Sequence, residues 1–464
     1  MCRIRLDLRL FLYILAAAGH AAAEDVVDVG QLQQQLDALS KQVEQLQQHN
    51  TAPPATTETL TDAWCAPPVE KPQGDKPTYP IIKMTGFFHA DAGWFGQDAL
   101  NMLTPVDGTP IGDIQDGADF RRARLAAVGD LTENTGYMLE MDFAFPGRPS
   151  FMDVWAEVKD TFALGNFRVG QWRQPFSMDA MTSVRELPML ERALPFAFVP
   201  FRQIGAGFYG NNEAADLTWA YSVFRFPTDT FGGNVGDNGG FGLATRWTWV
   251  PLTSHNDHRL LHMGVNYSFG DPANDVVRYR NQPEFFVSET GGADLVPAAV
   301  PANVPLFVDT GIIPTQNFNL YGAEVAGVLG SFWHQSEVIF SHINRTGGGD
   351  NFFWGAYSQI GYYLTGEVRP YNHKGGVLTR VTPLDPVGKC HGLGAWEVVG
   401  RWSYIDLNDA TVAGNELTNL SAGLNWHLNR NLKWQFQYIH GFLDNIAVGQ
   451  SNANIYAMRV QMDF

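Results

Sequence analysis

The sequence has few cysteines, few charged residues and no long hydrophobic run. Three cysteines in 464 residues are too few for a framework of disulfide bonds, so stability must come from other interactions. Charged residues make up 17% of the chain, below the roughly 25% of ordinary soluble domains. Beyond the first two dozen residues, no apolar run approaches the about 20 residues that a membrane-spanning helix needs, which excludes a helical membrane protein.

The residues that are abundant favour strands. Aromatic residues reach 13% and glycine contributes 47 residues, a mixture typical of an all-β protein. The formal net charge is −17, from 31 Lys and Arg against 48 Asp and Glu. Because nucleic acid binding needs compensating cations, this balance disfavours a nucleic acid partner.

The N-terminus predicts export. Three arginines precede the apolar stretch 10–18, and small residues at 21–23 suit cleavage after Ala23, so residues 1–23 are typical of a signal peptide. Cleavage removes Cys2 and leaves Cys65 and Cys390, which could form one disulfide bond or remain two free thiols.

Residues 24–48 carry a heptad pattern. The spacing alternates between three and four residues along one seam, with glutamine-rich polar positions between: Val29, Leu32, Leu36, Leu39, Val43 and Leu46. This predicts a short coiled coil between chains, although a single amphipathic helix packed on its own protein would show the same seam. Residues 49–82 are rich in Thr, Pro and Ala and predict an extended linker.

From residue 83 to 464, apolar side chains fall on alternate positions in segments of about ten residues. In residues 259–269, for example, Leu261, Met263 and Val265 share one face. A soluble β-sandwich would also alternate. Here aromatic residues gather near segment ends on the apolar face, and the polar face keeps many small residues. Both features favour a membrane β-barrel with lipid outside and water inside.

Sixteen candidate strands can be counted, which is an even number that closes a barrel around an aqueous channel. They start near Lys83, Phe120, Tyr137, Phe151, Asn166, Ile204, Ala215, Phe241, Arg259, Leu320, Trp333, Phe352, Ala395, Thr418, Leu432 and Ile455. Short and long connections alternate, except that the long segment 366–394 falls on the side of the short turns. This segment carries Cys390, and the linker with Cys65 enters from the same side.

Alternation also predicts the residues that face the channel. The inward set mixes both charges: Arg122, Arg124, Glu140, Asp142, Asp153, Glu157, Lys159, Arg246, His262, Asn266, Glu337, Glu397, Arg401, His427, Lys433, Gln435, Gln437 and Arg459. Arg168 and Arg173 lie an odd number of residues apart, so both can face inward only if a bulge intervenes.

The long connection 175–203 follows the fifth strand and is the predicted constriction. It contains five charged residues: Arg185, Glu186, Glu191, Arg192 and Arg202. Opposed rows of charge would orient dipolar solutes, whereas a net positive ring would favour anions. The alternative is an extracellular cap.

The sequence predicts no enzyme, no cofactor and no metal site. Ser421 and His427 share a strand face, but six residues separate them by about 20 Å in an extended strand. A nucleophile and its base need hydrogen-bond contact, which this separation prevents.

Several short motifs in order resemble the phosphate-selective porin O and P family. They are Phe-Arg-Arg-Ala-Arg-Leu at 120–125, Leu-Glu-Arg at 190–192, Leu-Thr-Gly-Glu at 364–367, Gly-Ala-Trp-Glu at 394–397, Gly-Leu-Asn-Trp at 423–426 and the terminal Phe464. The resemblance implies a homotrimeric sixteen-stranded outer-membrane porin with an inward third loop and an arginine-lined pore. It carries pore roles to Arg121, Arg122 and Arg124, and to Arg192 within its motif.

The leading prediction is therefore a trimeric porin in the outer membrane, with its N-terminal segment in the periplasm. Small polar or anionic solutes would pass through it, and the sign of its selectivity stays open. The alternative is a structural tether, in which the coiled coil and linker reach the cell wall and the barrel serves as an anchor.

Overall fold

A computed structural model describes residues 78–106, 108–144, 149–161, 164–226, 239–254, 258–285, 287, 304–388 and 392–464. The predicted signal peptide, the coiled coil, nearly all of the linker, Cys65 and Cys390 lie outside these residues. The description below therefore concerns the body of the chain.

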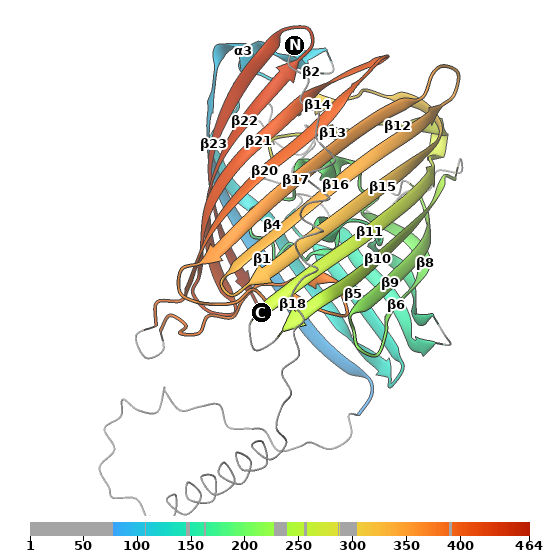
Figure 1. Cartoon of the computed structure of the whole chain (residues 1–464), viewed down its shortest axis with the longest axis vertical. Coiled ribbons are helices and arrows are strands. Elements are labelled where there is room, and N and C mark those ends of the chain that lie inside the picture. Colours follow the sequence, from blue (N-terminus) through green and yellow to red (C-terminus); the bar gives the residue numbers. More distant parts are fainter. Residues whose placement is uncertain are drawn as a thin grey trace, which may run out of the picture. The chain divides into compact units, whose positions relative to one another are not determined.

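Sixteen long antiparallel strands form one closed barrel (Figure 1). The strands are β1 (Ile81–Gln97), β4 (Gly117–Thr132), β5 (Thr135–Asp142), β6 (Ser150–Thr161), β7 (Gly165–Arg173), β8 (Arg202–Asn211), β9 (Leu217–Arg225), β10 (Phe241–Ser254), β11 (Arg259–Asp271), β15 (Ile313–Leu329), β16 (Phe332–Arg345), β17 (Asn351–Tyr363), β20 (Ala395–Asp409), β21 (Val412–His427), β22 (Leu432–Asn445) and β23 (Gly449–Asp463). Each pairs with the next, and β23 pairs with β1, so the ring has no open edge. The predicted sixteen-stranded barrel is confirmed; the largest offset is at β15, which was expected from Leu320 and begins at Ile313.

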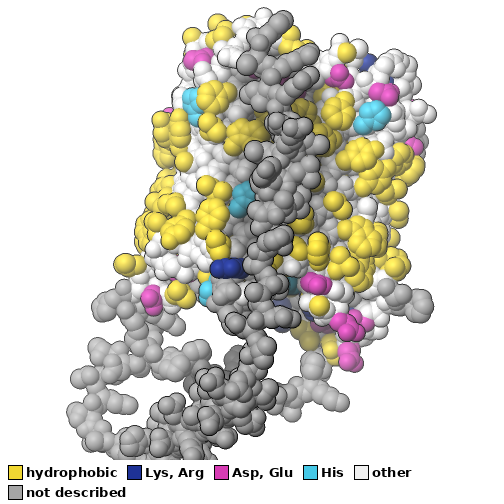
Figure 2. All heavy atoms as spheres, viewed as in Figure 1, with side chains coloured by type: hydrophobic (Ala, Val, Ile, Leu, Met, Phe, Trp, Pro, Cys, Tyr) yellow, Lys and Arg dark blue, Asp and Glu magenta, His cyan; other side chains and the backbone are white. Residues whose placement is uncertain are grey.

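The outer wall is apolar because every second side chain points away from the barrel interior. Large exposed hydrophobic residues recur along it, including Trp249, Val265, Tyr321 and Trp402. Figure 2 shows hydrophobic side chains over the visible wall and acidic side chains toward its two ends. The predicted apolar face of residues 259–269 is thus the outward face.

Short elements occupy the connections. They are α3 (Ala99–Leu103), β2 (Pro105–Val106), β3 (Thr109–Pro110), α4 (Met178–Met181), η2 (Leu194–Phe198), η3 (Ala273–Asp275), β12 (Val276–Val277), β13 (Arg280–Asn281), β14 (Val308–Asp309), β18 (Tyr371–Asn372) and β19 (Val377–Leu378). Among the described residues, no helix is long and apolar enough to cross a membrane. At one end of the barrel the turns are short, as at 330–331, and at the other the connections include 98–116, 174–201 and 272–312.

Two connections matter most for the interior. The inner loop, residues 174–201, joins β7 to β8 and contains α4 and η2. The returning segment, residues 364–394, joins β17 to β20 on the short-turn side and contains β18 and β19.

The hydrophobic core lies inside the barrel. Phe176, Leu194 and Phe198 of the inner loop are buried in one cluster with Phe318 and Phe353 of the wall. Burial of these side chains holds the loop against the inner face of the strands, because removing apolar surface from water lowers the free energy.

Candidate functional site: a charged interior with an open cavity

The inner loop lies inside the barrel and does not form a cap over it. Inward polar side chains of the wall bind its backbone: Met178 N and Asp179 N donate to the Glu337 carboxylate, at 3.0 and 2.7 Å. Leu190 N donates to Gln437 Oε1 at 2.8 Å. These contacts satisfy backbone groups that burial would otherwise leave without partners, and so they hold the loop in the lumen.

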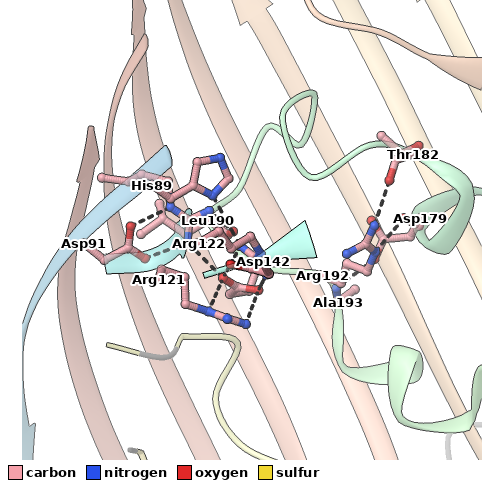
Figure 3. Close-up of polar contacts among 12 residues, drawn as sticks. His89, Asp91, Arg121, Arg122, Asp142, Asp179, Thr182, Leu190, Arg192 and Ala193 are labelled. Carbon is pink, nitrogen blue, oxygen red and sulfur yellow. Dashed lines mark hydrogen bonds and ion pairs between the residues drawn. The ribbon is translucent and has the colours of Figure 1, made fainter. Parts of the chain in front are cut away.

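Glu191 of the inner loop is the centre of an arginine cluster, defined here as Glu191, Asp91, Arg121, Arg122 and Arg459. Its carboxylate accepts from Arg122 Nη2 at 2.7 Å, from Arg121 Nε at 3.0 Å and from Arg459 Nη2 at 2.9 Å. Arg459 also donates to both oxygens of Asp91, at 2.7 and 2.6 Å. Figure 3 shows Arg121 and Arg122 of β4 close to Asp91 of β1 and to Leu190 of the inner loop. Three cations thus face two carboxylates, all buried.

A β-bulge explains how neighbouring arginines reach the same carboxylate. In the pairing of β1 with β4, His89 lies opposite Arg122 and Ala90 lies opposite Phe120, so Arg121 is an extra residue. An extra residue breaks the alternation of faces. Arg121 and Arg122 therefore both point inward, although strict period two would send them to opposite faces.

The electrostatics of the inner loop follow from burial and these partners. Burial raises the pKa of Glu191, but the charges of Arg121, Arg122 and Arg459 outweigh burial and hold that pKa well below its ordinary value. Burial also lowers the pKa of Arg192 to about 9, partly offset by the charge of Asp179. Glu191 is consequently ionised and paired at neutral pH.

Most of the other predicted wall residues face inward and are paired. The contacts are Arg124 Nε with Asp142 at 2.7 Å, Arg246 Nη2 with Glu324 at 2.6 Å and Arg401 Nη2 with Glu284 at 2.7 Å. Arg202 was expected in the constriction loop but is the first residue of β8, where its Nε pairs with Asp153 at 2.9 Å. Lys433 Nζ donates to Leu187 O at 3.1 Å. Lys159 differs, since it lies near a strand end, is about a third exposed and pairs with Asp130.

The remaining loop residues divide between ring contacts and backbone contacts. Arg185 lies over the Phe87 ring at 5.5 Å from its centroid. Arg192 lies over the Phe196 and Phe201 rings, at 5.1 and 5.0 Å from their centroids. It also donates to backbone carbonyls of its own loop, including Asp179 O at 2.9 Å. Glu186 accepts through its backbone oxygen from Arg369 of the returning segment at 3.1 Å.

The returning segment lies against the inner wall from the other end. Gly376 O accepts from Arg246 Nη2 at 2.6 Å, and the Tyr371 hydroxyl lies 2.6 Å from His262 Nδ1. Arg369 stacks on the Trp333 ring at 3.9 Å. The segment that broke the alternation of short and long connections is thus part of the barrel interior.

A cavity of about 200 Å³ remains on the side of β7 to β10. We call it the cationic cavity, because Arg168, Arg173, Arg246 and Lys374 line it while no Asp or Glu does. Its position inside the barrel follows from its other lining residues, which include Pro175 and Met181 of the inner loop.

Four important residues were missing from the sequence-based set. Asp91 and Glu324 follow the period-two pattern of their strands and could have been found by it. Glu284 lies in a long connection that carries no periodic signal. Arg173 points to the inner loop although Arg168 also faces inward, and Gly170, with φ of +130°, lies between them. The expected bulge between the two arginines is absent, since β7 pairs with β8 in one register from Asn166 to Arg173. Arg173 reaches the inner loop from the last position of β7.

Comparisons with known proteins agree with this geometry. Residues 103–464 match the family described as phosphate-selective porin O and P. The chain is 26% identical over 440 residues to an uncharacterized protein of Caulobacter vibrioides, covering 89% of this chain and 82% of that protein. It is 25% identical over 385 residues to Porin O of Pseudomonas aeruginosa, covering 77% of this chain and 84% of that protein. Among solved structures, OmpT, an outer membrane protein of Vibrio cholerae, is similar at 8% identity with a TM-score of 0.48, covering 83% of this chain and 99% of that one.

Proposed function

The chain belongs to the phosphate-selective porin O and P family, and from this membership we propose that its channel prefers anions. As a member of that family with a closed sixteen-stranded barrel, the protein is an outer-membrane porin. Its barrel forms a channel for the passive diffusion of small polar solutes. The proposal concerns the sign of the charge that passes most readily.

The observation that carries the proposal is the lining of the cationic cavity. Four cationic side chains and no carboxylate face the open volume of about 200 Å³. A channel wall of one charge attracts solutes of the opposite charge and raises their local concentration. The net charge of −17 describes the whole chain, whereas no Asp or Glu lines this cavity.

The arginine cluster has a different role in this proposal. Its three arginines are largely neutralised by Glu191 and Asp91, which leaves one net positive charge beside the lumen. We assign it mainly to holding the inner loop as a constriction. The pore roles of Arg124, Arg192, Arg202, Arg401 and Lys433 are proposed in the same sense, as side chains that position the loop or line the path beside it.

We propose the rest of the architecture from the sequence. Residues 1–23 act as the signal peptide, residues 24–48 as a periplasmic coiled coil and residues 49–82 as its linker to the barrel. The heptad seam and the family membership support a homotrimer. In an oxidising periplasm, Cys65 and Cys390 could be joined. The protein acts as a channel and not as an enzyme.

The test is the reversal potential of the purified mature protein in planar bilayers under a KCl gradient. An anion-preferring trimer should insert with three correlated conductance steps and a reversal potential of the sign set by chloride. A reversal potential of the opposite sign would overturn the anion preference. Stable insertion without conductance, together with envelope defects on deletion of residues 24–80, would instead support the structural tether.

A further inference from the structure

The cationic cavity has walls that are mostly apolar. Trp172, Pro175, Met181 and Ala220 contribute carbon surface from two strands and the inner loop, and Tyr209 adds an aromatic ring. At the roughly 30 Å³ that each water occupies in the liquid, the volume of about 200 Å³ would hold about seven waters. It therefore exceeds what a single small inorganic anion fills.

Two of the cations at this cavity pair directly with no carboxylate among the described residues. Arg173 donates only to neutral carbonyls of the inner loop, to Met181 O at 2.7 Å, Thr182 O at 2.9 Å and Ala180 O at 3.4 Å. The Lys374 ammonium is exposed and has no side-chain partner among the described residues. The charges of Asp153, Glu140 and Glu186 act on Arg173 without pairing with it. The Lys374 ammonium is therefore the less compensated of the two charges that a solute can meet here.

The other two cations are held in place. Arg246 pairs with Glu324 at 2.6 Å. Arg168 pairs with Glu157 at 2.6 Å and lies over the Trp155 ring at 3.9 Å and the Tyr209 ring at 4.6 Å. Such contacts on aromatic faces restrict a guanidinium to one orientation. The cavity wall at β6 to β8 is consequently rigid and preformed, as ligand sites usually are.

We propose that this cavity binds a small organic anion, with one carboxylate or phosphate group held between Arg173 and Lys374 and an apolar or ring portion packed on the Trp172, Met181 and Ala220 surface. Inorganic phosphate is hydrated on every side, so it would lose water against these carbon atoms without compensation. An anion with an apolar portion gains from the same contact, because it removes carbon surface from water on both partners. This inference rests on the proposed anion preference and specifies the solute class.

The test uses the full mature protein in planar bilayers, with chloride as the current carrier and benzoate or inorganic phosphate as the added blocker. Benzoate should half-block the current at a concentration about ten-fold lower than phosphate, a difference expected for a ligand portion that fills an apolar pocket. Equal potency of the two anions, or stronger block by phosphate, would overturn the inference.

Substitutions then locate the site. Ala220→Leu extends a side chain into the cavity and should raise the half-blocking concentration of benzoate about ten-fold while phosphate block changes less. Lys374→Gln should weaken both blockers, because both are anions. Lys83→Gln removes an exposed lysine at the start of β1 and serves as the matched control. Unchanged benzoate block in Ala220→Leu channels of normal conductance would contradict the inference.

The two proposals fail in different ways. Loss of anion preference in the wild-type reversal potential would overturn the proposed function itself. An anion-preferring channel that benzoate blocks no better than phosphate would retain the proposed function and reject only the organic anion site.

Discussion

The two sides of the barrel interior use arginine differently. Beside β1, β4 and β23, the inner loop lies against the wall. Arg121, Arg122 and Arg459 form ion pairs there with Glu191 or Asp91. Beside β7 to β10, a cavity stays open, and Arg173 donates its hydrogen bonds to neutral carbonyl oxygens, while the charge of Asp153 acts on it without pairing with it. The same residue type therefore anchors a loop on one side and offers its charge to solutes on the other.

This difference follows from where the acidic residues lie. The inner loop presents the carboxylate of Glu191 to the first side, whereas α4 presents backbone oxygens to Arg173. A carboxylate cancels an arginine charge, while a carbonyl dipole only orients it. The number of arginines along the wall therefore does not determine the electrostatic potential of the path. That potential also depends on whether each arginine pairs with a carboxylate or with a carbonyl oxygen.

The largest effect is expected from breaking the packed side with Glu191→Gln. Three buried guanidinium groups would lose their shared counter-charge, and removing one partner of a buried pair costs roughly 3–5 kcal/mol. The loop should loosen, the single-channel conductance should rise about two-fold or more and anion preference should increase. Single-channel recording and the temperature at which the barrel unfolds on a gel measure these effects.

Glu186→Gln is the comparison variant, since it removes a carboxylate from the same loop but leaves the arginine cluster intact. It should raise the conductance less than Glu191→Gln does. Equal conductance and stability of Glu191→Gln and the wild type would show that the cluster does not hold the loop.

A smaller effect is expected from the open side. Arg173→Gln removes from the cationic cavity a charge that no carboxylate pairs with directly, and it should lower the anion-to-cation permeability ratio by about three-fold. Arg173→Lys should keep most of this ratio, because the charge remains although the hydrogen bonds from Nη1 to the carbonyls of residues 180–182 are lost. Reversal potentials in a salt gradient measure both variants.

Arg124→Gln tests the packed side of the interior in the way that Arg173→Gln tests the open side. Arg124 donates to Asp142 at 2.7 Å in the packed region, so its loss should reduce thermal stability more than it changes the permeability ratio. If Arg124→Gln changed the ratio more than Arg173→Gln, the assignment of selectivity to the open side would be wrong.

The sequence predicted the barrel well because its signal is local and repeated. Lipid outside and water inside impose alternation on every strand, and sixteen repeats of the pattern compensate for errors in any one. Met263 and Val265 were expected to share the apolar face, and both are exposed residues of the outer wall. The strand ends were less certain, as β15 shows, because alternation fades where a strand leaves the membrane.

The interior was harder to predict. The pairing of Arg121 with Glu191 depends on a bulge, and an extra residue leaves no mark in the hydrophobic pattern. Glu284 accepts a hydrogen bond from Arg401, which lies 117 positions away in the sequence, and Glu284 itself belongs to an irregular connection. Contacts of this kind depend on how loops fold back, and period two carries no information about them.

The smallest effect is expected from a change of pH, which should leave the conductance nearly constant on the packed side of the interior. The lowered pKa of Glu191 means that its contribution to stability is present above its ordinary value of 4.5 and is lost only as the pH falls through the lower folded value. Between about pH 8 and about pH 5 the charge that holds the inner loop should therefore stay constant. Conductance recorded across this range should show no step that Glu191→Gln abolishes. Such a step would mean that Glu191 exchanges protons at neutral pH, and hence that the three arginines do not hold its carboxylate as tightly as their distances of 2.7 to 3.0 Å imply.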